Sequence, residues 1–189
     1  MSVFVAAYGW EHPGWSGSYY PEDLPDDWRL DFYANEFRAV VVPAARWRAD
    51  AAEAAVAWYE DTPAGFNFFL EVPSEEAARS RMEAAVAVLG PKVAGLLLRG
   101  GAEAGTLAER YPVCPLAGEG TVRADSRGAG PLAVARWGPE RGADAAALRP
   151  MVDSLAGRAP TALLLFEGNP PDVQAMGTAR TIIQLLGAD

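Results

Sequence analysis

The sequence contains one cysteine, Cys114, and one histidine, His12, among its 189 residues. A single cysteine excludes a disulfide within the chain and suits a reducing compartment. One cysteine and one histidine also exclude a zinc site that is built from those residue types within one chain. We therefore expect no metal and no other cofactor, although the acidic residues leave a carboxylate site for a harder cation open.

The chain also lacks a long hydrophobic run and a basic start. No apolar run approaches the roughly 18 residues that a membrane helix needs, and no basic segment precedes the apolar residues 3–7, so no signal peptide is indicated. Positive charge is scarce, because 16 Lys and Arg residues stand against 25 Asp and Glu residues, for a net charge of −9. Such a balance repels phosphate backbones and anionic lipids. We expect a cytoplasmic protein that binds neither nucleic acid nor membranes.

What the chain does contain is a series of short apolar runs that alternate with amphipathic segments. Six runs are typical of buried strands, with a weaker seventh near Val122: residues 3–7, 39–42, 66–72, 95–98, 132–136 and 161–166. The amphipathic segments between them predict helices over residues 26–36, 50–61, 74–89, 144–155 and 172–186. This alternation predicts βα units with a parallel sheet. The length suits a single domain over residues 1–189.

The N-terminal third carries a pattern of aromatic and small residues that resembles a known family. The matching residues are Gly9-Trp10, Trp15, Tyr20-Pro21, Trp28, Tyr33-Ala34, Phe37 and Val40, followed by Gly65-Phe66, Phe68, Val72-Pro73, Leu89-Gly90 and Lys92. In order and spacing they resemble the YecE-like family (domain of unknown function 72), whose members adopt a TIM-barrel-like fold. The chain resembles a divergent and shortened member of this family. The resemblance implies a parallel β/α barrel, shortened or incomplete, with about six or seven strands.

The chain departs from the family pattern at the predicted strand ends. Val41 and Pro43 stand where the family has a Glu and an Asn, and Ala135 and Trp137 stand where it has an Arg and a His. The paired asparagines of the family after the last strand are replaced by 167–168, a Glu and a Gly. In a β/α barrel the polar residues at the C-terminal strand ends form the active site. The resemblance therefore implies that the polar site residues of the family are largely lost.

Three charged residues follow predicted strands and form the main candidate site. Glu71, Arg99 and Glu167 each lie at a strand C-terminus, and a barrel points all three at one mouth. Two carboxylates with an arginine suit acid–base chemistry or anion binding. The same residues also suit a structural ion cluster that seals the barrel, and we favour that interpretation.

The remaining candidates come from the aromatic loop and from the later strand ends. His12 is a candidate acid or base, although a lone loop histidine is more often packed or solvated. Trp10 and Tyr20 are candidate ligand-binding residues, since their rings suit stacking, but a plug at one end of the barrel is favoured. Trp137 and Asn169 complete the ligand-binding candidates.

We expect a small-ligand binding or interaction module. The alternative is an enzyme, a hydrolase or an isomerase, that uses Glu71 and Glu167 in a rebuilt carboxylate site. A weaker third alternative is an acidic docking face for a basic protein. A barrel with missing units leaves a sheet edge that must be covered by loops or by a second chain, which predicts a homodimer.

Overall fold

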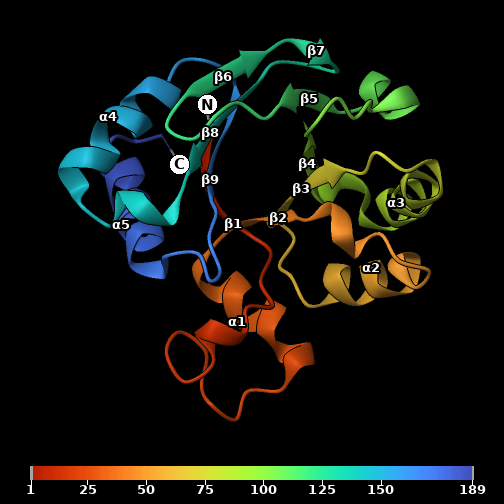
Figure 1. Cartoon of the computed structure of the whole chain (residues 1–189), viewed down its shortest axis with the longest axis horizontal. Helices are drawn as coiled ribbons and strands as arrows, with labels where there is room; N and C mark the ends of the chain where they lie inside the picture. Colours follow the sequence, from red (N-terminus) through yellow and green to blue (C-terminus); the bar gives the residue numbers. More distant parts are fainter. Residues whose placement is uncertain (1, 189) are drawn as a thin grey trace.

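A computed structural model describes residues 2–188, and its strands form one sheet that curls into a nearly closed barrel (Figure 1). The strand order is β6-β8-β9-β1-β2-β3-β4-β5-β7. The strands are β1 (Ser2–Tyr8), β2 (Ala39–Val42), β3 (Asn67–Val72), β4 (Val93–Leu98), β5 (Pro112–Pro115), β6 (Val122–Asp125), β7 (Arg127–Gly128), β8 (Leu132–Trp137) and β9 (Thr161–Phe166). Neighbouring strands are parallel except in the pairs β5–β7 and β6–β8.

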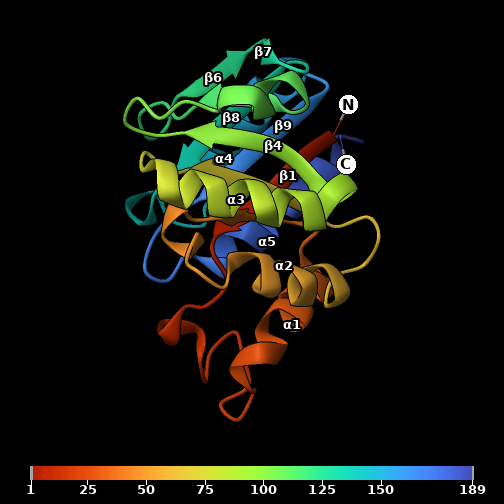
Figure 2. The same ribbon diagram turned by 90° about the vertical axis from the view of Figure 1, so that its right-hand side faces the viewer.

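Five α-helices lie outside the ring of strands (Figures 1 and 2). They are α1 (Arg29–Glu36), α2 (Ala51–Glu60), α3 (Glu76–Leu89), α4 (Ala145–Leu155) and α5 (Val173–Leu185). The side chains of Asp144 and Asp172 cap α4 and α5 by accepting backbone N–H bonds of 2.9 and 3.0 Å. No described helix is long and apolar enough to cross a membrane.

The predicted number of six or seven strands was too low, because the structure has nine. Seven of them run parallel, and β6 and β7 run antiparallel to their neighbours. The sequence did not predict β5, since it is four residues long and has a proline at each end. It did not predict β7 either, which has only two residues, Arg127 and Gly128. Such short elements carry no usable hydrophobic period.

The two ends of the sheet are joined by consecutive residues of the chain. β6 pairs with β8, and β7 pairs with β5, so residues 122–128 cross the gap between the two outermost parallel strands. Asp125 stabilises the turn. Its carboxylate accepts a hydrogen bond from the backbone N–H of Arg127 at 2.9 Å and forms a salt bridge with the Arg127 guanidinium group. The gap is thus spanned by a loop of the chain itself. The homodimer stays a prediction.

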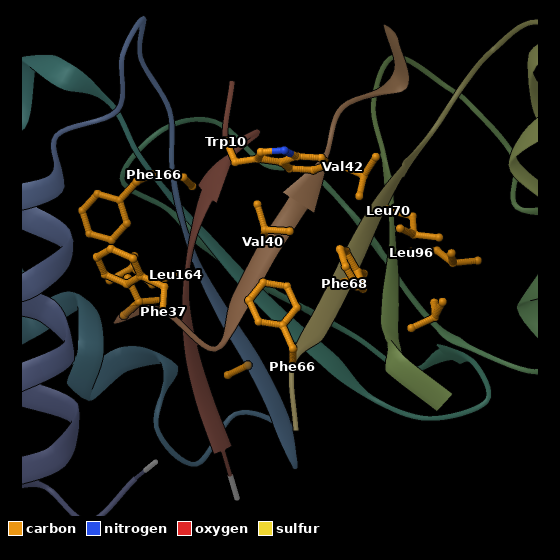
Figure 3. Packing of buried hydrophobic residues seen from close by; sticks show 14 of the residues in the cluster. Trp10, Phe37, Val40, Val42, Phe66, Phe68, Leu70, Leu96, Leu164 and Phe166 are labelled. Atoms are coloured by element: carbon orange, nitrogen blue, oxygen red, sulfur yellow. The ribbon is translucent and has the colours of Figure 1, made fainter. Parts of the chain in front are cut away.

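The alternation of side chains along each strand produces two apolar cores. One fills the barrel and includes Ala6, Val41, Phe69, Leu97 and Leu163. The other lies between the strands and the helices; Val40, Val42, Phe68, Leu70, Leu96, Leu164 and Phe166 belong to it (Figure 3). The barrel is narrow, since a Cβ atom on Gly95 of β4 would come within 2.8 Å of Leu132 Cδ2.

The aromatic loop after β1 is packed into the outer core. Trp10, Trp15 and Tyr20 are all buried, and Trp10 belongs to the same core as Val42 at the end of β2 (Figure 3). The Tyr20 hydroxyl donates to the Trp10 carbonyl oxygen at 2.8 Å, and Trp15 Nε1 donates to the Pro171 carbonyl oxygen at 3.0 Å. The rings of Trp10 and Tyr20 are therefore covered by the chain itself.

Lys92, the single lysine of the sequence, is buried without a carboxylate beside it in the described residues. Its ammonium group donates to the carbonyl oxygens of Tyr59 and Thr62 at 2.6 Å each and to the Thr62 hydroxyl at 2.9 Å. These acceptors lie at the C-terminal end of α2, where the helix dipole favours a positive charge. Burial lowers the pKa of Lys92. Lys92 thus caps the C-terminal end of α2.

Candidate functional site

Five polar side chains meet inside the barrel at the C-terminal ends of its strands. They are Tyr8 from β1, Glu71 from β3, Arg99 directly after β4, Arg136 from β8 and Glu167 directly after β9. Period-two alternation turns these positions toward the barrel axis above the apolar inner core. We call these five residues the mouth cluster. The sequence predicted that Glu71, Arg99 and Glu167 would point at one mouth, and they share hydrogen bonds there.

Glu71 is the most deeply buried member of the mouth cluster, with 3 % of its side chain exposed. Its Oε1 accepts a bond from Arg99 Nε at 2.5 Å. Its Oε2 accepts a bond from the Tyr8 hydroxyl and another from the backbone N–H of Ala44 at 2.9 Å. Burial, followed by the hydrogen bond to Glu71, raises the pKa of Tyr8, so the phenol stays a proton donor. Both oxygens of Glu71 are thus occupied.

Glu167 is held between two guanidinium groups. Its Oε1 accepts a bond from Arg99 Nη2 at 2.8 Å, and its Oε2 accepts a bond from Arg136 Nε at 2.7 Å. Arg136 also donates from Nη1 to the carbonyl oxygen of Ala117 at 2.8 Å, which ties the cluster to the segment after β5. Charge-assisted bonds of this kind are among the stronger hydrogen bonds in proteins. Glu167 therefore has no oxygen without a donor.

Arg99 is the most exposed charged group of the mouth cluster, with 42 % of its side chain accessible. It lies over the Tyr8 ring, with 5.6 Å between the guanidinium carbon and the ring centroid. Burial opposes its charge, but the hydrogen bonds to Glu167 and Glu71 outweigh burial and raise the pKa of Arg99. A guanidinium group has five N–H donors, and the described residues accept bonds only from Nε and Nη2. The edge formed by Nη1 and Nη2 keeps donors available.

His12 and Asn169 lie together beside the mouth cluster. His12 Nε2 lies 3.0 Å from the carbonyl oxygen of Tyr8, and the side chain of Asn169 hydrogen-bonds to His12. Burial lowers the pKa of His12, with a smaller contribution from the positive charge of Arg46 in the same direction. The imidazole is therefore neutral near pH 7 and is engaged on the side of the Tyr8 carbonyl group.

Strand β8 places its residues differently from what the family resemblance implied. Leu132 and Val134 belong to the inner core, whereas Ala135 and Trp137 belong to the outer core. Trp137 is buried there, with its Nε1 donating to the carbonyl oxygen of Gly142 at 3.0 Å. The expectation that Ala135 and Trp137 replace polar residues at the mouth was therefore wrong. Arg136, one residue away, occupies the inward position.

Sequence reasoning missed Tyr8 and Arg136 in the mouth cluster. Each continues a period-two series of inner-core residues: Phe4 and Ala6 precede Tyr8, and Leu132 and Val134 precede Arg136. This alternation in the sequence could have predicted that Tyr8 and Arg136 face the barrel interior. Trp10, Tyr20 and Trp137 lie in the outer core, so of the ligand-binding candidates only Arg99 and Asn169 are near the mouth.

The arrangement limits the chemistry at the mouth. Both carboxylates accept hydrogen bonds on each oxygen, so a substrate would have to compete with the donors that already hold them. Within residues 2–188 no group of three or more His, Cys, Asp or Glu side chains lies close enough together to hold a metal ion. The mouth cluster does offer a ligand the partly exposed guanidinium group of Arg99.

The fold and the mouth cluster define an α/β protein with a barrel-like sheet whose polar groups lie at the C-terminal strand ends. A profile of the family described as "Protein of unknown function DUF72" matches residues 4–112. This match covers more than half of the 189 residues. The chain belongs to the DUF72 family, in agreement with the YecE-like resemblance.

Solved structures of DUF72 family proteins have a similar fold. One from Thermotoga maritima aligns with a TM-score of 0.67 at 13 % identity, over 97 % of this chain and 100 % of that chain. Another, from Enterococcus faecalis, aligns with a TM-score of 0.65 at 11 % identity, over 96 % of this chain and 95 % of that chain. Comparison with curated proteins found no match. At these identities the structural likeness concerns the fold alone.

Proposed function

We propose that this protein is a small-ligand binding module whose site is the mouth cluster, and that Arg99 recognises a small carboxylate. The observation that carries the proposal is the unequal use of hydrogen-bonding groups. The carboxylates of Glu71 and Glu167 are occupied, whereas Arg99 is 42 % exposed and retains its Nη1–Nη2 edge. A guanidinium edge with two parallel N–H groups matches the two oxygens of a carboxylate.

Two further features support anion binding at this position. The mouth cluster contains two carboxylates and two guanidinium groups, so their formal charges cancel and do not repel an anion. Arg99 is also already fixed by Glu71, by Glu167 and by the Tyr8 ring. A side chain that is ordered before binding loses less conformational entropy when the ligand arrives.

The proposal is tested by titrating acetate and succinate into the 15N-labelled protein and following the amide and arginine Nε–Hε resonances. We expect saturable shifts at Tyr8, at Arg99 and in the loop after β4. In Arg99→Lys, which keeps the charge but loses the planar fork, the affinity should fall about tenfold or more. Arg149→Gln is the control, since Arg149 is exposed on α4 and, among residues 2–188, its side chain bonds only to Asp153. Absence of shifts at the mouth in the parent protein would refute the site.

The rival function is an enzyme that uses Glu71 and Glu167. It draws support from one observation, namely that Arg99 links the two carboxylates at the strand ends. Turnover of nitrophenyl esters or nitrophenyl glycosides by the parent protein, with loss of turnover in Glu167→Gln, would favour the enzyme and contradict the binding module. We expect no turnover that depends on Glu167.

A further inference from the structure

A groove between the start of β6 and α4 differs in charge from the other grooves of the described surface. Its charged lining residues are Arg141 and Arg158, and no Asp or Glu lines it. Each of the three other grooves described includes a carboxylate, from Glu36, Asp172 or Glu75. In a chain of net charge −9, a groove whose charged lining residues are all positive favours an anionic ligand. We call this the β6–α4 groove.

Neither arginine of the β6–α4 groove forms an ion pair with another described residue, whereas Arg149 on the same helix pairs with Asp153 at 3.1 Å. Arg141 is nevertheless held in place. Its guanidinium carbon lies 5.3 Å from the centroid of the Trp137 ring. Its Nη2 packs against Gly120 so closely that a Cβ atom there would lie 1.8 Å away. Arg141 is thus positioned by an aromatic ring and a glycine and keeps its donors available.

The rest of the lining is suited to an organic group larger than a simple ion. The groove has a volume of about 450 Å³, and Val122, Pro150 and Met151 give it an apolar side. Ser154 of α4 also lines it, and the Ser154 hydroxyl donates no bond to any described residue. A phosphate group bound by the arginines would leave room for a carbon skeleton against the apolar side chains.

We propose that the β6–α4 groove binds a phosphate monoester of a small organic molecule. Arg141 and Arg158 bind the dianionic phosphate through charge-assisted hydrogen bonds, the Ser154 hydroxyl supplies a neutral donor, and the apolar side chains contact the organic part. This site lies outside the barrel and does not share a residue with the mouth cluster. The test of the β6–α4 groove is therefore independent of the test of the mouth cluster.

The test uses phenyl phosphate as the probe, with phenol and inorganic phosphate as comparisons, by isothermal titration calorimetry at low ionic strength. We expect phenyl phosphate to bind more tightly than either comparison. Arg141→Gln and Arg158→Gln should each raise the dissociation constant about tenfold. Arg149→Gln on the same helix should change it less than about twofold, since Arg149 does not line the groove.

Several results would overturn the proposal. They are absence of binding at millimolar phenyl phosphate, equal affinity in the parent protein and in both groove variants, and equal affinity for phenol. Binding that is lost in Arg99→Lys instead would place the phosphate at the mouth cluster and would likewise overturn it. Circular dichroism spectra of the variants establish that they are folded, and both substituted arginines are exposed, so loss of the fold is not expected.

Discussion

The two ends of the barrel interior have opposite chemistry. The end at the strand N-termini is filled by apolar groups: Phe4 and Phe69 pack edge to face with 5.8 Å between ring centroids, and Leu132 packs against Gly95. The end at the strand C-termini is filled by the mouth cluster. Leu97 and Leu163 continue this apolar packing, whereas the second end keeps Arg99 partly exposed. Apolar packing therefore stabilises one end of the interior, and a hydrogen-bonded network organises the other.

The largest effect is expected at the apolar end. Phe69 is fully buried, contacts Phe4 and lies opposite Gly95 in the pairing of β3 with β4. Phe69→Ala removes this ring from a closely packed interior and should lower the free energy of unfolding by about 3–5 kcal/mol. Urea denaturation followed by tryptophan fluorescence measures it. A loss below about 1 kcal/mol would mean that the apolar end is not tightly packed.

At the mouth, Glu71→Ala should lower the free energy of unfolding by about 2–4 kcal/mol. It leaves the Tyr8 hydroxyl and the backbone N–H of Ala44 without an acceptor in a mostly buried position, and Arg99 loses one of its two partners. Glu71→Gln keeps one acceptor oxygen and should lose less. Glu75→Gln is the control on the exposed surface. If Glu71→Ala and Glu75→Gln behaved alike in urea denaturation, the network would have no structural role.

Lys92 differs from the charges of the mouth cluster, since it is buried and its hydrogen-bond acceptors are oxygen atoms without a formal charge. Lys92→Met should lower the free energy of unfolding by about 2–3 kcal/mol, because the carbonyl oxygens of Tyr59 and Thr62 lose their donor. Since Lys92 is the single lysine, its side-chain 13C resonance can be followed directly, and its pKa should lie below the ordinary value. An ordinary or raised pKa would contradict the burial.

The width of the barrel at its apolar end is tested by Gly95→Ala. The added methyl group would lie 2.8 Å from Leu132 Cδ2 and 3.4 Å from Phe69 Cδ1, so unfolding should become easier by about 1–2 kcal/mol. Leu132→Val in the same chain removes that Cδ2 contact and should restore part of the loss. Additive losses in the double variant would show that the two residues do not contact each other.

The smallest effect is a dependence of stability on pH that arises from His12. Burial lowers its pKa in the folded state below the ordinary 6.5. The unfolded chain therefore takes up the proton first, so this contribution to stability is complete above about pH 7 and is lost as pH falls below 6.5. Comparison of urea midpoints between the parent protein and His12→Gln at pH 5.5 and pH 8 measures it. The parent protein should lose more stability than the variant at the lower pH.

The sequence predicted the parallel units and three members of the mouth cluster because these depend on local patterns. Apolar runs such as residues 39–42 and 161–166 define buried strands, and a polar residue directly after such a run lies at the strand end. Within the closing segment over residues 112–128 only the weak strand near Val122 was predicted, since pairing with distant strands leaves little local period. Ala135 and Trp137 were placed at the mouth, where the structure has Arg136, since a shift of one residue along a strand exchanges its two faces.

The most direct test of the central claim is a crystal structure of the protein soaked with succinate, together with the same soak of Arg99→Lys. We expect a carboxylate against the Nη1–Nη2 edge of Arg99, with Glu71 and Glu167 still bonded to the guanidinium group, and no ligand there in Arg99→Lys. Succinate bound elsewhere, or Arg99 turned away from both carboxylates, would contradict it.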